Sequence, residues 1–315
     1  MANTLSADAH MDGKAYIVTG PTSGIGRATA LELASHGTVV LVGRNGGRLG
    51  EVRELIERKG GRAVAVVCDL ADLASVRRAA EEIVAMRLTI AGLLNNAGVM
   101  SMGAARNAKG WDLTFLTNHL GPFALTEALM PYLPDGANVL FVASAVEDPE
   151  RKPAVAAGFR GSRYVSARAS LCGEWRPGGS KTPGFDAYAT SKQCNIAAAM
   201  VFAREMPRLH VNAVEPGLNP TTSLGLRDAN AFVRALSKLI VPLLVPLLMP
   251  FVKILSTPKR AARVISRILT DTSGASGVYY DERGQSMQGS VQIRDPKFAE
   301  RVVAETRALL SAMPI

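Results

Sequence analysis

The sequence predicts an α/β domain in which a doubly wound, mainly parallel sheet of about seven strands carries helices on both faces. Short apolar runs recur along the chain, and helix-length segments separate them, as in repeated β-α-β units. The first run ends in a glycine-rich turn, and 29 glycines suit many tight connections between strands and helices. With 48% apolar residues among 315, the chain can bury the core of one large domain.

Composition narrows the function classes only a little. The net charge of +9 comes from scattered lysines and arginines, and no basic stripe with interleaved aromatics indicates a nucleic-acid surface. Three cysteines (Cys68, Cys172 and Cys194) have neither disulfide-framework nor metal-ligand spacing, which favours a reducing compartment and no metal site. Residues 1–12 lack the pattern of a signal peptide, so we expect a flexible arm, a single domain over 13–315 and a cytoplasmic protein.

The first predicted strand, Ala15–Gly20, leads into a turn and then a helix. The turn reads Pro21-Thr22-Ser23-Gly24-Ile25-Gly26, with glycines at positions 20, 24 and 26. Such a turn lets backbone N–H groups approach a pyrophosphate at the N-terminus of a helix. The sequence therefore predicts a dinucleotide-binding turn here, although the same pattern also occurs as a plain connector.

The second predicted strand, Thr38–Gly43, ends at Arg44. In dinucleotide-binding folds an acidic residue at this place holds the ribose hydroxyls, whereas an arginine receives a 2′-phosphate. Arg44 therefore favours NADP over NAD, with Thr22 or Ser23 as assisting residues.

A charged helix over Glu51–Lys59 precedes the third predicted strand, Ala63–Cys68. This strand runs into Asp69 and Leu70, and its carboxyl end is where α/β sheets bind ligands, so Asp69 could contact adenine. Asp72 is expected to cap the next helix, Leu73–Met86.

The remaining elements continue the alternation of strands and helices. They are strands at Ala91–Leu94, Asn138–Ala143, His210–Val214 and Gly277–Tyr280, and helices at Trp111–Met130 and around Lys297–Leu310. The fourth strand ends in Asn95-Asn96-Ala97-Gly98, and the fifth delivers Ser144 to its carboxyl end.

Tyr188 and Lys192 stand four positions apart in a predicted helix and so project from the same face. An ammonium group beside a phenol favours the phenolate, so the spacing predicts that Lys192 lowers the pKa of Tyr188. Such a pair suits proton transfer at working pH.

Taken together, these motifs resemble those of the short-chain dehydrogenase/reductase family, from Lys14 to about Thr221 and more loosely to the end. The resemblance implies a Rossmann-type fold and a catalytic tetrad. The matching positions are Gly20, Gly24, Ile25 and Gly26 in the cofactor turn, Asn96, Ala97 and Gly98 after the fourth strand, Asn118, Ser144, Tyr188 and Lys192 in the tetrad, and Pro216, Gly217 and Thr221 beside the nicotinamide.

The resemblance also implies the role of each tetrad residue. Tyr188 would exchange a proton with the substrate oxygen, while Ser144 would hydrogen-bond that oxygen. Lys192 would bind the nicotinamide ribose, and Asn118 would hold a water that links Lys192 to solvent. His119, next to Asn118, points elsewhere and is expected to pack rather than react.

The expected function is NADP(H)-dependent reduction of a ketone or aldehyde on a hydrophobic small molecule, or oxidation of the corresponding alcohol. Arg44 and the run from Asn118 to Phe123 look most like the retinol dehydrogenase and protochlorophyllide reductase branch. Two alternatives stay open: reduction of a C=C or C=N bond on the same scaffold, and a non-catalytic NADP(H)-binding regulator.

Two segments depart from the family pattern. An insert of about 147–184, rich in Gly, Arg, Ser and Pro, separates Ser144 from Tyr188 by 44 positions, and we expect a loop that shapes the substrate site. A comparable insert in carbonyl reductases of the family obstructs an oligomerisation face, which implies a monomer, with a homodimer as the alternative.

The second departure lies in the substrate-covering region, about 218–258. Leu239–Val252 is an apolar run broken by Pro242, Pro246 and Pro250. It is too short to span a bilayer, which takes about 20 apolar residues. It could form a pocket wall, a peripheral membrane contact or a subunit interface.

Overall fold

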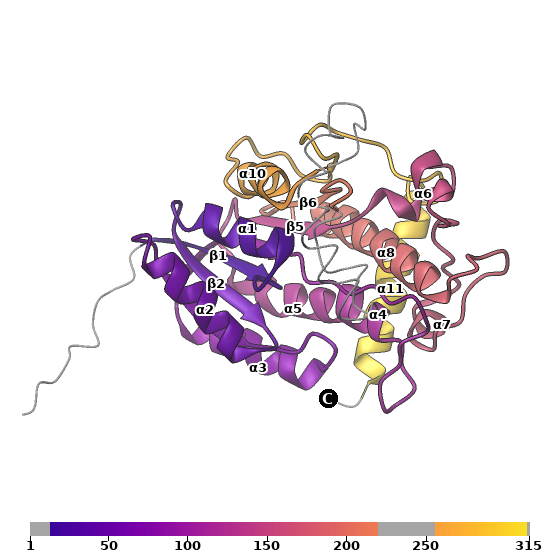
Figure 1. The fold of residues 1–315 in the computed structure, drawn as a ribbon, viewed down its shortest axis with the longest axis horizontal. Coiled ribbons are helices and arrows are strands. Elements are labelled where there is room, and N and C mark those ends of the chain that lie inside the picture. Colours follow the sequence, from indigo (N-terminus) through magenta and orange to yellow (C-terminus); the bar gives the residue numbers. More distant parts are fainter. Residues whose placement is uncertain (1–12, 220–255, 314–315) are drawn as a thin grey trace, which may run out of the picture.

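A computed structural model describes residues 13–219 and 256–313. They form one α/β domain around a seven-stranded parallel sheet of order β3-β2-β1-β4-β5-β6-β7, as predicted (Figure 1). The strands are β1 (Lys14–Thr19), β2 (Thr38–Gly43), β3 (Ala63–Val67), β4 (Thr89–Asn95), β5 (Asn138–Val142), β6 (His210–Val214) and β7 (Tyr279–Tyr280). The helices between them are α1 (Gly24–Leu33), α2 (Gly46–Glu57), α3 (Leu73–Ala85), α4 (Leu113–Phe115), α5 (Gly121–Leu129), α6 (Lys152–Ala156), α7 (Ala167–Leu171), α8 (Pro183–Glu205), α10 (Pro258–Leu269) and α11 (Pro296–Ala312).

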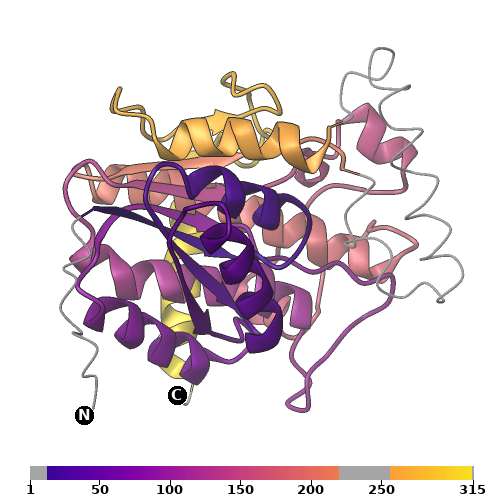
Figure 2. The same ribbon diagram turned by 60° about the vertical axis from the view of Figure 1, so that its left-hand side comes forward.

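Side chains that alternate along each strand build two separate cores, one on each face of the sheet. Ile17 and Val40 face the core that α3, α5 and α8 cover, whereas Val18 and Leu41 face the core under α1, α2 and α10. Figure 2 shows the orange helix α10 and the yellow helix α11 on opposite sides of the sheet. Because both faces are covered, the strands are apolar almost throughout.

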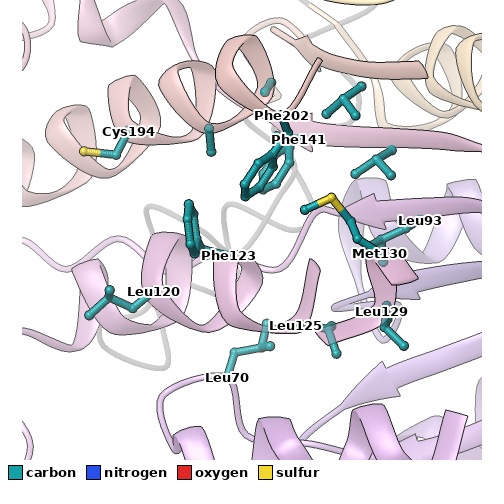
Figure 3. Packing of buried hydrophobic residues seen from close by; sticks show 14 of the residues in the cluster. Leu70, Leu93, Leu120, Phe123, Leu125, Leu129, Met130, Phe141, Cys194 and Phe202 are labelled. Atoms are coloured by element: carbon teal, nitrogen blue, oxygen red, sulfur yellow. The ribbon is translucent and has the colours of Figure 1, made fainter. Parts of the chain in front are cut away.

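The larger core contains an aromatic group where α5, α8 and β5 meet. The ring of Phe202 lies 5.0 Å from that of Phe123 and 6.2 Å from that of Phe141, measured between centroids (Figure 3). All three side chains are fully buried. This packing fixes α8, which carries Tyr188 and Lys192, against β5, the strand that leads to Ser144.

Several element boundaries differ from the prediction. The helix expected from Glu51 already begins at Gly46, because the Asn45 side chain accepts a hydrogen bond from the Arg48 N–H and caps it. Asp72 caps α3 as expected. The helix expected over Trp111–Met130 is interrupted by a π-helical turn, Leu116–Leu120, and ends in a 3-10 turn, Met130–Tyr132.

The insert is more regular than the loop that was predicted. It holds the short helices α6 and α7, and a 3-10 turn, Ala145–Glu147, precedes it. The buried Glu147 carboxylate accepts hydrogen bonds from the Ser290 N–H and hydroxyl and from the Gln193 amide. These bonds tie the beginning of the insert to α8 and to the segment before α11.

Candidate active site

The carboxyl ends of four adjacent strands bring most of the predicted site residues to one edge of the sheet. Because β1, β4, β5 and β6 are neighbours and parallel, the residues that follow them lie side by side. These residues are Gly20, Asn96 and Ser144, which were predicted, and Glu215, which was not. In open α/β sheets this edge is where ligands bind.

The glycine turn packs closely against the segment after β4 because side chains are missing from it. A Cβ on Gly26 would lie 2.3 Å from the Gly20 carbonyl oxygen and 2.4 Å from Asn96 Nδ2. Gly20 and Gly24 also adopt positive φ angles of 67° and 53°. Ser23 begins α1 in an extended conformation without a side-chain cap, so the first N–H groups of α1 remain available to an anion. The turn therefore fits a pyrophosphate.

Arg44 and Asp69 follow β2 and β3, the two strands on the far side of β1 from the tetrad. Arg44 is exposed and, within residues 13–219 and 256–313, has no hydrogen-bond or ion-pair partner. The Asp69 carboxylate accepts a hydrogen bond from the Ala71 N–H at 3.0 Å, and Leu70 is buried in the core. Thr22 and Ser23 lie in the turn, partly and fully exposed.

Thr19 and Asn96 join the ends of β1 and β4. The Thr19 hydroxyl accepts hydrogen bonds from the N–H groups of Asn96 (2.9 Å) and Ala97 (3.0 Å), and Asn96 Nδ2 donates to the Thr19 carbonyl at 2.8 Å. A Cβ on Gly98 would lie 3.7 Å from Lys192 Nζ, so this segment passes directly beside the tetrad.

Asn118 lies within the π-helical turn and is fully buried. Its side chain pairs with the backbone of Val99, accepting from the N–H at 2.7 Å and donating to the carbonyl at 2.9 Å. The side chain also donates to the Ser191 hydroxyl at 3.1 Å, while the backbone carbonyl of Asn118 accepts a hydrogen bond from Asn195 Nδ2. Asn118 thus connects the fourth-strand segment to α8.

Tyr188 and Lys192 lie on one face of α8, with Lys192 Nζ 5.4 Å from the centre of the tyrosine ring. Burial lowers the pKa of Lys192 to about 8, and its ammonium donates to the Val142 carbonyl at 2.9 Å. Burial, followed by the charge of Glu215, raises the pKa of Tyr188. The predicted lowering of the Tyr188 pKa by Lys192 is therefore wrong for this structure, because the spacing of the pair does not account for the loss of solvent.

Glu215 is a site residue that the sequence analysis missed. Its side chain is only 4% exposed, and its carboxylate accepts hydrogen bonds from the N–H groups of Ala145 and Gly217. Burial raises the pKa of its carboxyl group, although the Ala145 N–H, the charge of Arg151 and the nearby Ser144 side chain lower it. An acidic residue directly after an apolar strand, and before Pro216-Gly217, was the signal that could have identified it.

The insert packs directly against Tyr188. Phe159 stacks on Phe185 with ring centroids 4.1 Å apart, and its ring lies 6.4 Å from that of Tyr188. Ala154, Met100 and Val146 complete this apolar cluster. The expectation that the insert borders the site therefore agrees with its position in the fold.

Other predicted positions lie apart from the tetrad or outside the described residues. His119 is fully buried between the Phe115 and Phe123 rings, contacts Asn195 and Thr306, and has its pKa lowered by burial to about 4. It packs, as expected. Pro216 and Gly217 follow β6, and Asn219 donates to both carbonyls. Thr221, the arm 1–12 and the apolar run 239–252 lie outside the described residues.

The part of the chain that the structure describes contains neither a membrane-spanning helix nor a cluster of metal ligands. None of the helices there has the length and apolar character needed to cross a membrane. No group of three or more His, Cys, Asp or Glu side chains in that part could hold a metal ion.

Comparisons with known proteins identify the family to which the sequence is similar. The short chain dehydrogenase family model matches residues 14–157. The short-chain dehydrogenase/reductase pkfC of Emericella nidulans is 34% identical over 250 residues, which cover 72% of this chain and 73% of the relative. A Streptomyces sp. protein named for ketoreduction at C-13 of daunorubicin is 33% identical, over 66% of each chain. The chain spans between 44% and 65% of the length of three further fungal relatives.

A solved structure supports the fold. L-Sorbose reductase from Gluconobacter frateurii, complexed with NADPH and L-sorbose, superposes with a TM-score of 0.65 at 22% identity over 88% of this chain and 97% of that one. At this identity the likeness concerns the fold alone. The motifs, the sheet order and the similarity to pkfC together show that the chain belongs to the short-chain dehydrogenase/reductase family, whose members are oxidoreductases.

Proposed function

We propose that the protein is an NADP(H)-dependent oxidoreductase that reduces a ketone or aldehyde of a hydrophobic small molecule, or oxidises the corresponding alcohol. The observation that supports this proposal is the position of the Tyr188–Lys192 pair, which lies beside Gly98 and beside the end of β5, the strand that leads to Ser144. The named daunorubicin ketoreductase among the relatives supports carbonyl reduction as the class of reaction.

The nicotinamide, when bound, supplies or accepts the hydride. Tyr188 holds a proton at its phenolic oxygen and gives it to the carbonyl oxygen of the substrate, which becomes the alcohol. Because burial raises the pKa of Tyr188, the residue stays protonated over the ordinary pH range and is ready to act as an acid. Ser144 holds the same substrate oxygen by a hydrogen bond.

Lys192 can lose and regain a proton during turnover. Its pKa of about 8 lies close to working pH, so it can return a proton to Tyr188 after the transfer. The Gly98 backbone lies next to its ammonium group, where the nicotinamide ribose of family members is held. Lys192 therefore has two roles in the proposal: ribose binding and supply of protons.

Arg44 supports NADP over NAD. Its guanidinium is exposed at the end of β2, without a partner among the described residues, where it can pair with a 2′-phosphate. Asp69 and the Gly98 segment would border the adenine and the ribose. The expected result for Arg44→Ala is a KM for NADPH raised about tenfold or more with NADH kinetics unchanged. The control is Arg53→Ala, which removes an exposed arginine that pairs with Glu57 within α2.

The apolar cluster around Phe159, Phe185 and Tyr188 supports a hydrophobic substrate. Aromatic side chains beside the proton donor bury apolar substrate surface and exclude water from the reacting carbonyl. A sugar-like substrate would find few hydrogen-bond partners in this cluster.

The test is NADPH consumption with a panel of lipophilic aldehydes, ketones, enones and quinones, with NADH in parallel. Turnover of ketones that prefers NADPH supports the proposal, whereas turnover of enones alone would replace it by C=C reduction. Tyr188→Phe should abolish turnover and leave NADPH binding intact, and the exposed Tyr132→Phe is the matched control. If Tyr188→Phe turns over like the wild type, Tyr188 is not the acid. NADPH binding without turnover of any substrate would favour the alternative function, a non-catalytic NADP(H)-binding regulator.

A further inference from the structure

Glu215 occupies the centre of the candidate site, yet the proposed reaction assigns it no role. It follows β6 directly, and its backbone N–H donates to the Tyr280 carbonyl at 2.8 Å, which fixes the residue in the sheet. Its side chain turns inward toward the neighbouring strand, and only 4% of its surface is exposed. A carboxylate held this deeply in protein is costly unless it is well paired.

The Glu215 carboxylate joins two segments that border the reacting groups. Oε2 accepts a hydrogen bond from the Ala145 N–H, immediately after Ser144, and Oε1 accepts one from the Gly217 N–H at 3.2 Å. The Ser144 side chain lies close enough to the same carboxylate to lower its pKa. One side chain therefore sets the position of the serine relative to the Pro216-Gly217 turn.

These contacts require a carboxyl group in particular. Both oxygens receive a backbone N–H, so a glutamine at this position would set its amide N–H₂ against one of the two donors. An aspartate keeps both acceptors but is shorter by one methylene group. The two substitutions therefore separate loss of charge from loss of reach.

Charged and titratable groups face Glu215 from every side. Tyr188 and Lys192 face it from α8, Arg151 from the insert, and Tyr279 and Glu282 from β7 and the turn that follows it. The negative charge of Glu215 favours the protonated forms of both Tyr188 and Lys192. It thereby acts on the proton donor and on the residue that resupplies the donor.

We propose that Glu215 is a positioning residue for the proton transfer: its carboxylate holds the Ala145 and Gly217 N–H groups and thereby fixes the Ser144–Ala145 segment against the Pro216-Gly217 turn. Its effect on the titration of Tyr188 and Lys192 provides the readout of this position. The role rests on the proposed function of the site. The substrate itself touches Ser144 and Tyr188 and need not touch Glu215.

The first measurement needs no turnover. Wild-type, Glu215→Gln and Glu215→Asp proteins are labelled with ¹³Cε-lysine, and Lys192 is followed by NMR as a function of pH, with Lys192→Met to assign its signal. The wild-type signal should titrate near pH 8. Glu215→Gln should move this titration down by about one pH unit, as expected for loss of a nearby opposite charge, and Glu215→Asp should move it much less.

The second measurement is the pH dependence of kcat for NADPH-dependent ketone reduction. Glu215→Gln should lower kcat about tenfold, which is less than the 10²–10³-fold cost of deleting a hydrogen-bond donor outright. The alkaline limb of its pH profile should also move to lower pH. A purely structural role would lower the amount of folded enzyme without moving either titration. Glu127→Gln, which removes a partly buried carboxylate on α5 that pairs with Arg307 on α11, is the control.

The outcomes separate this inference from the proposed function. If ketone reduction occurs and Glu215→Gln leaves both the Lys192 titration and the pH profile unchanged, the inference on Glu215 is overturned and the function stands. If the Lys192 titration shifts but no carbonyl substrate turns over, the charge coupling stands and the proposed function fails.

Discussion

Replacing Lys192 by Met should make the folded protein more stable while it destroys the proposed activity. Burial lowers the pKa of Lys192 from 10.5 to about 8, and at about 1.4 kcal/mol per pH unit this corresponds to roughly 3 kcal/mol of unfavourable free energy for the charged form. Methionine carries no charge and nearly fills the same volume. It loses the bond from Nζ to the Val142 carbonyl, worth about 1 kcal/mol, although Asn195 Nδ2 still approaches that carbonyl at 3.4 Å.

The expected gain in the free energy of unfolding at pH 7 is therefore about 2 kcal/mol. The gain should depend on pH with a definite sign. Below about pH 8 both the folded and the unfolded wild type carry the lysine proton, so the full cost is present. Between pH 8 and 10.5 the folded protein has released this proton while the unfolded chain still holds it, so wild-type stability rises with pH and the advantage of the variant shrinks.

Urea denaturation of both proteins at pH 7 and at pH 9.5 measures the effect. Lys152→Met, at an exposed position of α6, is the control and should change stability by less than about 0.5 kcal/mol. The reasoning is refuted if Lys192→Met is less stable than the wild type at pH 7. It is also refuted if the difference between them is the same at both pH values.

Three further predictions concern the cofactor turn, the core and the insert. Gly26→Ala should abolish NADPH binding in a fluorescence titration, because the new Cβ would lie 2.3 Å from the Gly20 carbonyl oxygen. The control Gly50→Ala should bind NADPH normally, because a Cβ at this position has no atom within 4 Å. Equal NADPH binding by both variants would contradict the prediction that the turn holds the cofactor. His119 has a folded pKa of about 4 against 6.5 in model compounds, so wild-type stability should fall by up to about 3 kcal/mol as pH drops from 6.5 to 4. His119→Gln should lack this part of the slope in urea titrations, and an unchanged slope would place its origin elsewhere. Phe159→Ala should raise KM for a bulky lipophilic ketone roughly tenfold, which corresponds to the loss of one aromatic contact, and should change kcat little. A fall in kcat without a change in KM would argue against a role of Phe159 in substrate binding.

The sequence predicts most accurately those features that depend on short stretches of chain. The parallel strands and the glycine turn follow from apolar runs and from glycines at positions 20, 24 and 26, and the structure places these elements as expected. Asp72 as a helix cap is an equally local feature. Boundaries were less accurate, because Gly46 and Gly47 disfavour a helix that the Asn45 cap and tertiary packing still impose.

Features that depend on burial could not be predicted in the same way. The four-residue spacing of Tyr188 and Lys192 predicts that they lie close together. The direction in which the Tyr188 pKa shifts, however, follows from burial and from the charge of Glu215, which is distant in sequence. Glu215 itself has no motif of its own, and its importance comes from the Ala145 and Gly217 N–H groups that converge on it. The helices of the insert are five residues each, too short for a periodic pattern.

The π-helical turn at Leu116–Leu120 fixes the number of residues between α4 and α5, in addition to requiring particular side chains. Such a turn corresponds to one extra residue in an α-helix, and each residue of an α-helix turns the chain by about 100°. Deleting one residue here would let an ordinary helix run from α4 into α5, but it would rotate the two halves against each other by that angle. Asn118 could then not face Val99 while Phe123 kept its place against Phe202. In relatives of this protein, a gap inside this turn would therefore signal the loss of the asparagine's contacts even where the asparagine itself is retained.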